Sequence, residues 1–154
     1  MKWLTSITLL LIFGGCDTKE NEPNKNKVEQ SINQPSKSMT ELKKAVLYNG
    51  DINAYNELDI AYLDYTFQEE FLLYAMIMAN KYDYPQAYFD VFTCLTGIYL
   101  SDLNQLDEKT ASLAIDYLLK AYEKGHHQAK DMVEEYEITS NENSKQQIER
   151  IFKD

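Results

Sequence analysis

Apolar residues recur through most of the chain at steps of three and four positions, the spacing of one face of an α-helix. These stripes lie within residues 42–46, 54–65, 71–82, 85–100, 114–122 and 129–136. Ser38 and Glu41 have the spacing of a capping box, which marks a helix start. No alternating run of β-branched residues competes with the helical period. The sequence therefore predicts an all-α fold of six or seven helices joined by short loops.

The first sixteen residues follow a different pattern. Lys2 supplies one charge, the eleven residues Trp3–Phe13 carry none, and the small residues Gly14 and Gly15 precede Cys16. Charge, apolar core and small residues in that order are typical of a secretory signal peptide. The apolar core is too short for a transmembrane helix, which needs about 20 residues.

Phe13-Gly14-Gly15-Cys16 resembles the lipobox of bacterial lipoproteins, with Phe13 where leucine is usual. The resemblance implies that residues 1–15 are removed and that lipid on Cys16 tethers the mature chain to a membrane of the bacterial cell envelope. A plain secreted protein cut near Gly15, or a short uncleaved anchor, is the alternative. Acyl chains contribute about 0.8 kcal/mol per buried methylene, so several of them would make a durable anchor.

The membrane and its face stay open at this point. Asp17 directly after the cysteine resembles the inner-membrane retention signal of some bacteria. In other bacteria, acidic residues shortly after the cysteine accompany export to the cell surface. The sequence is therefore compatible with the inner or the outer membrane, and with the periplasmic side or the cell surface.

Residues 16–37 are predominantly polar and contain no aromatic side chain. A segment of this kind cannot bury enough apolar surface to offset its chain entropy, so it is predicted to be a disordered tether. The domain proper is expected to span residues 38–154. It carries 21 acidic and 10 basic residues, which disfavours nucleic acid and anionic lipid headgroups. Such a charge serves either solubility or the binding of a protein partner with a basic surface.

A pattern of small residues recurs three times along the domain. A small residue, a turn residue and an alanine follow one another at intervals of four positions. The copies are Val46-Gly50-Ala54, Ala79-Asp83-Ala87 and Ala121-Gly125-Ala129. Their separation falls in the range of helix-pair solenoids, in which one helix ends, the chain turns and the next helix packs closely.

The third copy resembles the Sel-one-like repeat, a relative of the tetratricopeptide repeat. The matching residues are Ala114, Tyr117, Leu118, Lys120, Ala121, Gly125, His126 and Ala129. The family's Leu-Gly pair is absent, since Asp59, Phe92 and Glu134 occupy the glycine positions. The resemblance implies a short helix-pair solenoid with a scaffold or adaptor role. An irregular helical bundle is the alternative.

Catalytic and metal-binding motifs are not evident. His126 and His127 are adjacent, so they point in different directions, and no cysteine or further histidine lies three or four positions away to complete a metal site. The chain contains no glycine-rich phosphate loop and no nucleophile elbow. With Cys16 acylated, Cys94 has no disulfide partner and is expected to be a small core residue. We expect no enzyme activity, no metal and no cofactor.

All twelve tyrosines lie in the predicted domain. Tyrosine is enriched at interfaces because it offers a large apolar area and a hydroxyl at low entropy cost. Tyr55, Tyr74 and Tyr84 fall off the helical stripes, so they are the predicted partner-binding residues.

These features favour a membrane-tethered, non-enzymatic protein-binding lipoprotein of the cell envelope. A narrower version is an immunity-type lipoprotein that neutralises a basic toxin. A surface lipoprotein that binds a small ligand or glycan is an alternative of another class, with exposed tyrosines stacking on sugars. An envelope-assembly factor is not distinguished from the first hypothesis by sequence.

The lipid anchor gives the first testable prediction. Cys16→Ser removes the thiol that receives the acyl chains, so the variant should stay uncleaved or become soluble and should lose labelling by radioactive palmitate. Partitioning into detergent and gel mobility measure this. A processed variant that still enters the detergent phase completely would contradict the lipoprotein hypothesis.

Overall fold

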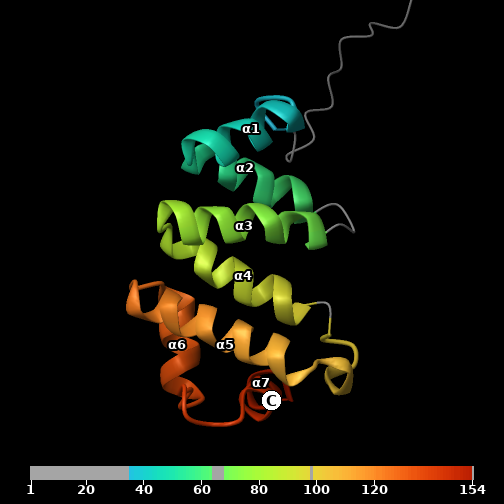
Figure 1. Ribbon diagram of the computed structural model, residues 1–154, viewed down its shortest axis with the longest axis vertical. Coiled ribbons are helices and arrows are strands. Elements are labelled where there is room, and N and C mark those ends of the chain that lie inside the picture. The colour runs from blue at the N-terminus through green and yellow to red at the C-terminus, as the bar shows by residue number, and fades with distance from the viewer. Residues whose placement is uncertain (1–34, 64–67, 98, 154) are drawn as a thin grey trace, which may run out of the picture. The chain divides into compact units, whose positions relative to one another are not determined.

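The computed structural model of the chain describes residues 35–63, 68–97 and 99–153 (Figure 1). The predicted signal peptide, Cys16 and nearly all of the predicted tether lie outside these ranges. Within them the chain forms seven α-helices, one short 3₁₀ helix and no strand. The helices are α1 (Met39–Asn49), α2 (Ile52–Leu63), α3 (Gln68–Tyr82), α4 (Pro85–Gly97), α5 (Glu108–Glu123), α6 (His127–Glu135) and α7 (Ser144–Lys153), and the 3₁₀ helix η1 is Leu103–Gln105. The prediction of an all-α fold with six or seven helices is confirmed.

Successive helices pack as hairpins and the hairpins stack in chain order. α1 contacts α2, α3 contacts α4, and α5 contacts α6. Contacts of α2 with α3 and of α4 with α5 join each hairpin to the next (Figure 1). α7 packs against α5 at the C-terminal end of the stack. This helix-pair packing is that of a short solenoid, and it leaves α2 to α5 with a neighbouring helix on each side.

The three hairpins share one kind of turn. Gly50, Asp83 and Gly125 adopt positive φ angles of +62°, +56° and +80°. The following residue of each turn donates its N–H back into the preceding helix: Asp51 to Ala45 O, Tyr84 to Met78 O and His126 to Ala121 O, at 3.4, 3.1 and 2.9 Å. A left-handed residue followed by such bonds is a common way to end a helix. The recurrence seen in the sequence therefore coincides with a repeated turn geometry.

The small residues on both sides of these turns lie in the core. Val46, Ala79, Ala121, Ala87 and Ala129 are fully buried, and Ala54 is 2% exposed. Small side chains at these points let the two helices of each hairpin approach closely near the turn. The turn residue that is not glycine, Asp83, accepts hydrogen bonds from Tyr88 Oη at 2.9 Å and from Lys124 Nζ at 2.7 Å. These bonds connect the second turn to the end of α5, and they hold the pKa of Asp83 below its usual value.

The first described residues are attached to α2. Ser36 donates two hydrogen bonds to the carboxylate of Glu57, from its backbone N to Oε2 and from Oγ to Oε1, each 2.7 Å long. Ser38 then caps α1 and forms the predicted capping box with Glu41. The entry of the chain into the domain is thus fixed at the first hairpin.

The glycines of the first and third turns provide a matched test of the turn geometry. Alanine at either position carries a Cβ in the left-handed region, which costs about 1–2 kcal/mol. At Gly50 the added Cβ would also overlap the ring of Tyr82, whereas nothing lies within 4 Å at Gly125. The Tyr82 ring is held by a 3.1 Å hydrogen bond from its hydroxyl to Leu47 O.

Gly50→Ala should therefore lower the free energy of unfolding by about 1–3 kcal/mol more than Gly125→Ala, the extra cost being overpacking. Urea titrations followed by circular dichroism compare the two variants. Equal losses would mean that the Tyr82 ring moves aside freely and that close packing at the first turn contributes little.

Candidate functional site

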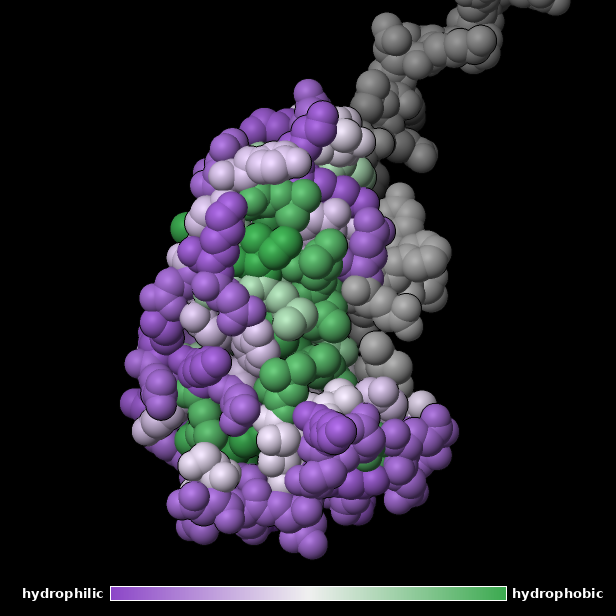
Figure 2. Space-filling model, in the orientation of Figure 1, coloured by the Kyte–Doolittle hydropathy of each residue, from purple (hydrophilic) through white to green (hydrophobic). Residues whose placement is uncertain are grey.

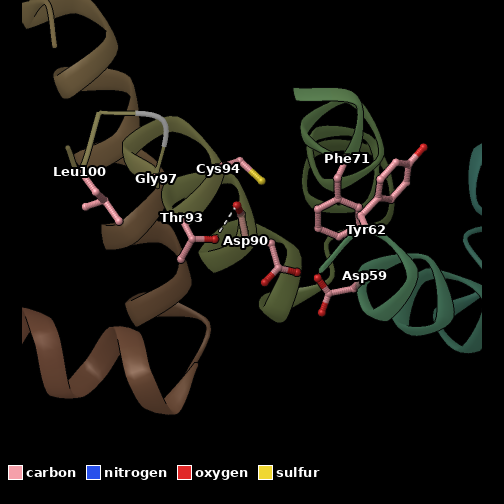
Figure 3. Close-up of a pocket in the computed structure, with 8 residues that line it drawn as sticks. All are labelled: Asp59, Tyr62, Phe71, Asp90, Thr93, Cys94, Gly97 and Leu100. Atoms are coloured by element: carbon pink, nitrogen blue, oxygen red, sulfur yellow. Dashed lines mark hydrogen bonds between the residues drawn. The ribbon is translucent and has the colours of Figure 1, made fainter. Parts of the chain in front are cut away.

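A pocket of about 270 Å³ lies between α2, α3 and α4 (Figure 3). α2 contributes Asp59 and Tyr62, and α3 contributes Phe71. α4 contributes Asp90 and Cys94. A second, more open hollow between α6 and α7 is lined largely by charged residues, among them Arg150 and Lys153, that already pair with Glu142 and Glu149. The pocket beside α4 is therefore the better candidate for a binding site.

Asp90 is a carboxylate inside the stack. Its side chain is only 7% exposed. Tyr55 donates its hydroxyl to Oδ2 at 2.6 Å, and Gln86 donates Nε2 to Oδ1 at 2.7 Å. Among the described residues no lysine, arginine or histidine forms an ion pair with it. Burial outweighs the two hydrogen bonds and raises the pKa of Asp90 to about 6.

The hydrogen bonds of Asp90 continue to the third hairpin. The Ala129 N–H donates to Nδ1 of His126 at 3.3 Å, so the proton of the neutral ring lies on Nε2. That nitrogen donates to Gln86 Oε1 at 2.8 Å, which turns the Gln86 amide NH₂ toward Asp90. Burial lowers the pKa of His126 and favours this neutral form. His126 also stacks on Phe89, with ring centroids 4.5 Å apart.

Burial in the same pocket also raises the pKa values of Asp59 and Cys94. Asp59 is half-buried, and burial raises its pKa. Within the described residues its carboxylate has neither a hydrogen-bond donor nor a cationic partner. Burial, then the two carboxylates, raise the pKa of the Cys94 thiol to about 12. Cys94 is thus a protonated, buried thiol at neutral pH, in agreement with its predicted core position.

The tyrosines selected from the sequence do not stand clear of the core. Tyr55 is fully buried, Tyr74 is 6% exposed and Tyr84 is half-buried. Tyr55 packs against Phe71 with centroids 5.3 Å apart and meets the edge of Tyr84 at 5.8 Å. The prediction that these three side chains are least needed for packing was wrong. Tyr55 and Tyr74 lie on helices that have a neighbouring helix on each side, and Tyr84, in the turn before α4, packs against the Tyr55 ring. Among the tyrosines that the structure describes, the exposed ones are instead Tyr48 and Tyr122.

Asp90 was missed by the sequence reasoning, although a signal was present. It stands between Phe89 and Val91 in a helix whose residues from Ala87 to Phe92 are all buried. An acidic residue inside such a run is costly to bury unless it has partners, so its position alone marks it as a candidate. Asp59 had been noted only as a departure from the repeat pattern.

Comparison of the chain with protein-family models, with curated proteins and with solved structures found no match. Within residues 35–63, 68–97 and 99–153, no group of three histidine, cysteine or acidic side chains is placed to hold a metal ion. No helix in this part of the chain is long and apolar enough to cross a membrane. The pocket holds two carboxylates that have no cationic partner among the described residues, beside the rings of Tyr62 and Phe71, and this arrangement is suited to receive a cation.

The buried charge of Asp90 gives a prediction on stability. A carboxyl group whose pKa is raised from 3.8 to about 6 by folding stabilises the fold below pH 4, and this contribution is lost as the pH rises through 6. Asp90→Asn keeps a neutral polar group beside Tyr55 and Gln86 and removes the titration. Relative to this variant, the wild-type chain should lose about 2 kcal/mol of unfolding free energy between pH 4 and 7.

Urea unfolding of both chains at several pH values measures the difference. The ionisable groups facing Asp90 are Tyr55 and Asp59 from α2 and Cys94 on α4 itself. Carboxylates whose pKa is lowered, such as Glu70, are present in both chains and cancel. Asp116→Asn, at an exposed position of α5, is the control. A constant difference between wild type and Asp90→Asn across this range would show that Asp90 does not titrate there.

Proposed function

We propose that the chain is a membrane-tethered, non-enzymatic lipoprotein of the bacterial cell envelope that binds a protein with a basic surface. Lipid on Cys16 supplies the tether and the helical stack supplies the binding surface. In the narrower form of the proposal the partner is a basic toxin, which the lipoprotein neutralises at the envelope. The observation that carries the proposal is the uncompensated negative charge of the folded domain.

Little of that charge is neutralised within the domain. Residues 38–154 hold 21 acidic and 10 basic side chains. Half of these basic residues are already paired with carboxylates; they are Lys43, Lys124, Lys130, Arg150 and Lys153. The remaining acidic side chains give the domain a negative field, which attracts a basic partner and accelerates its association.

The stack also presents apolar surface. Figure 2 shows apolar side chains gathered over α2 to α5, with hydrophilic side chains on both sides. Among the described side chains of these four helices, the large apolar residues that remain exposed are Ile52, Ile60, Leu73, Leu113 and Tyr122. An apolar area with a charged rim is typical of protein–protein interfaces. The structure gives glycan binding less support than the sequence did, because Tyr55 and Tyr74 are buried and have no face free to stack on a sugar.

Capture and kinetics test the proposal together. The full chain, immobilised in detergent, is exposed to envelope and secreted fractions, and captured proteins are identified and purified. We expect basic proteins whose association rate falls at least tenfold as salt rises from about 0.05 to 0.5 M, since charges beyond about 10 Å are screened above 0.1 M. The dissociation rate should change far less.

A glycan array probed with the same chain is the counterpart. Sugar binding without capture of any protein would contradict the proposal and favour the ligand-binding alternative. Capture of acidic proteins, or kinetics indifferent to salt, would contradict the role given to charge. Tyr55→Ala and Tyr74→Ala are unsuitable as binding variants, because loss of a buried aromatic ring costs about 3–5 kcal/mol of stability.

A further inference from the structure

The pocket beside α4 contains two carboxylates that form no ion pair with the described residues. Asp59 and Asp90, from two different hairpins, point toward each other across it (Figure 3). Neither carboxylate pairs with a cation among the described residues. Residues 64–67 and 98, which adjoin this region in sequence and are not described, contain no lysine, arginine or histidine. Within residues 35–63, 68–97 and 99–153 the chain thus supplies no counter-charge to these two carboxylates.

The hydrogen bonds of Asp90 leave part of its acceptor capacity unused. A carboxylate can accept about four hydrogen bonds. Asp90, more than nine-tenths buried, accepts two, both from neutral donors, Tyr55 and Gln86. A buried negative charge with neutral donors alone is costly, and a cation brought to it gains more than one at the surface. The free acceptor positions and the neighbouring Asp59 are therefore suited to a cationic hydrogen-bond donor.

The size and walls of the pocket narrow the choice of cation. Its volume of about 270 Å³ lies below the roughly 300–1,000 Å³ of pockets for drug-sized ligands, so one side chain fits better than a cofactor. The rings of Tyr62 and Phe71 form one wall, and Leu100, which is 53% exposed, lies at the margin. A guanidinium group is planar, weakly hydrated, stacks on aromatic rings and carries five donors. An ammonium group is more strongly hydrated and loses more on entry.

We propose that this pocket binds an arginine side chain of the partner, with its guanidinium between Asp59 and Asp90 and its methylene groups against Phe71 and Leu100. The inference rests on the proposed function for the source of the arginine. The affinity of the pocket for a guanidinium group is independent of the proposed function and is tested separately with small probes.

The first experiment uses the full chain in detergent and three capped amino acids: N-acetyl-arginine methylamide and its lysine and citrulline counterparts. Backbone amide shifts of Phe71 and Cys94 in NMR spectra report occupancy. We expect saturable binding of the arginine probe, at least threefold weaker binding of lysine and none of citrulline, which has the same shape without the charge. The pKa of Asp90, followed by carboxyl ¹³C shifts, should fall as arginine saturates the pocket.

Asp59→Asn should weaken arginine binding at least tenfold. Asp59 is half-buried and makes no hydrogen bond to the described residues, so the variant is expected to fold. Asp116→Asn removes the same charge from an exposed position and should leave binding within twofold of wild type. Equal losses in the two variants, equal binding of citrulline, or no saturable shift at Phe71 and Cys94 would each overturn the proposal.

A second experiment separates this inference from the proposed function. With a captured basic protein in hand, Asp59→Asn should raise its dissociation rate at least tenfold, while Asp116→Asn affects mainly the association rate. A basic partner that binds both variants alike would refute the pocket as its site and leave the proposed function standing. Saturable arginine binding without any basic partner would refute the proposed function and identify the pocket as a site for free cations.

Discussion

Hydrogen bonds that converge on the buried carboxylate of Asp90 connect all three hairpins of the stack. Tyr55 reaches it from the first hairpin, Gln86 from the second, and His126 from the turn of the third through the Gln86 amide. Tyr55 and Gln86 each donate to one carboxylate oxygen, and His126 orients the Gln86 amide, so loss of any of the three would leave a buried polar group with a partner missing. Polar contacts nearer the surface, such as Tyr82 with Leu47 O and Lys124 with Asp83, also join neighbouring hairpins. The Asp90 network differs from them in lying inside the stack, where it holds a charge away from water.

The stack of hairpins is built with one turn geometry that occurs three times. Each hairpin closes on a left-handed residue, and a small side chain follows four positions later, where the returning helix starts to pack. Two of the turns use glycine. The third uses Asp83, whose carboxylate bonds to Tyr88 and Lys124 and so offsets the strain of a positive φ. The polar side chain at this turn thereby adds a link between hairpins that glycine lacks. The turn at Asp83 therefore also links two hairpins. The second and third hairpins are joined by the bond of Asp83 to Lys124 and by that of Gln86 to His126.

The sequence predicted those features of the structure that depend on residues close together in the chain, and missed those that depend on residues far apart. The first six helices, the capping box at Ser38 and the three turns are local, and periodicity with small-residue spacing predicted them, whereas no apolar stripe marked α7. Burial of Tyr55 and Tyr74 depends on helices far along the chain, because a helix between two others buries two faces while a periodic stripe predicts one. The pocket brings Asp59 and Asp90 together across 31 positions, which no local pattern contains. Cys16 lies outside the described residues, so the lipid anchor remains a prediction. The resemblance to Sel-one-like repeats likewise remains a prediction, although the turns on which it was based do recur.

The attachment of Ser36 to Glu57 has a mechanical consequence. If the chain is held by its N-terminal side while a partner pulls on the domain, force enters at the start of α1 and is shared with α2 through this clasp. Glu57 and Asp59 are two residues apart on the same helix, so a load applied at the pocket reaches the clasp within a single turn of α2. The pocket also includes residues of α3 and α4, so the second hairpin shares this load, whereas the third hairpin contributes no lining residue and carries less force. The first hairpin would then transmit most of the force between the N-terminal side of the chain and the partner, and the third hairpin would stay folded.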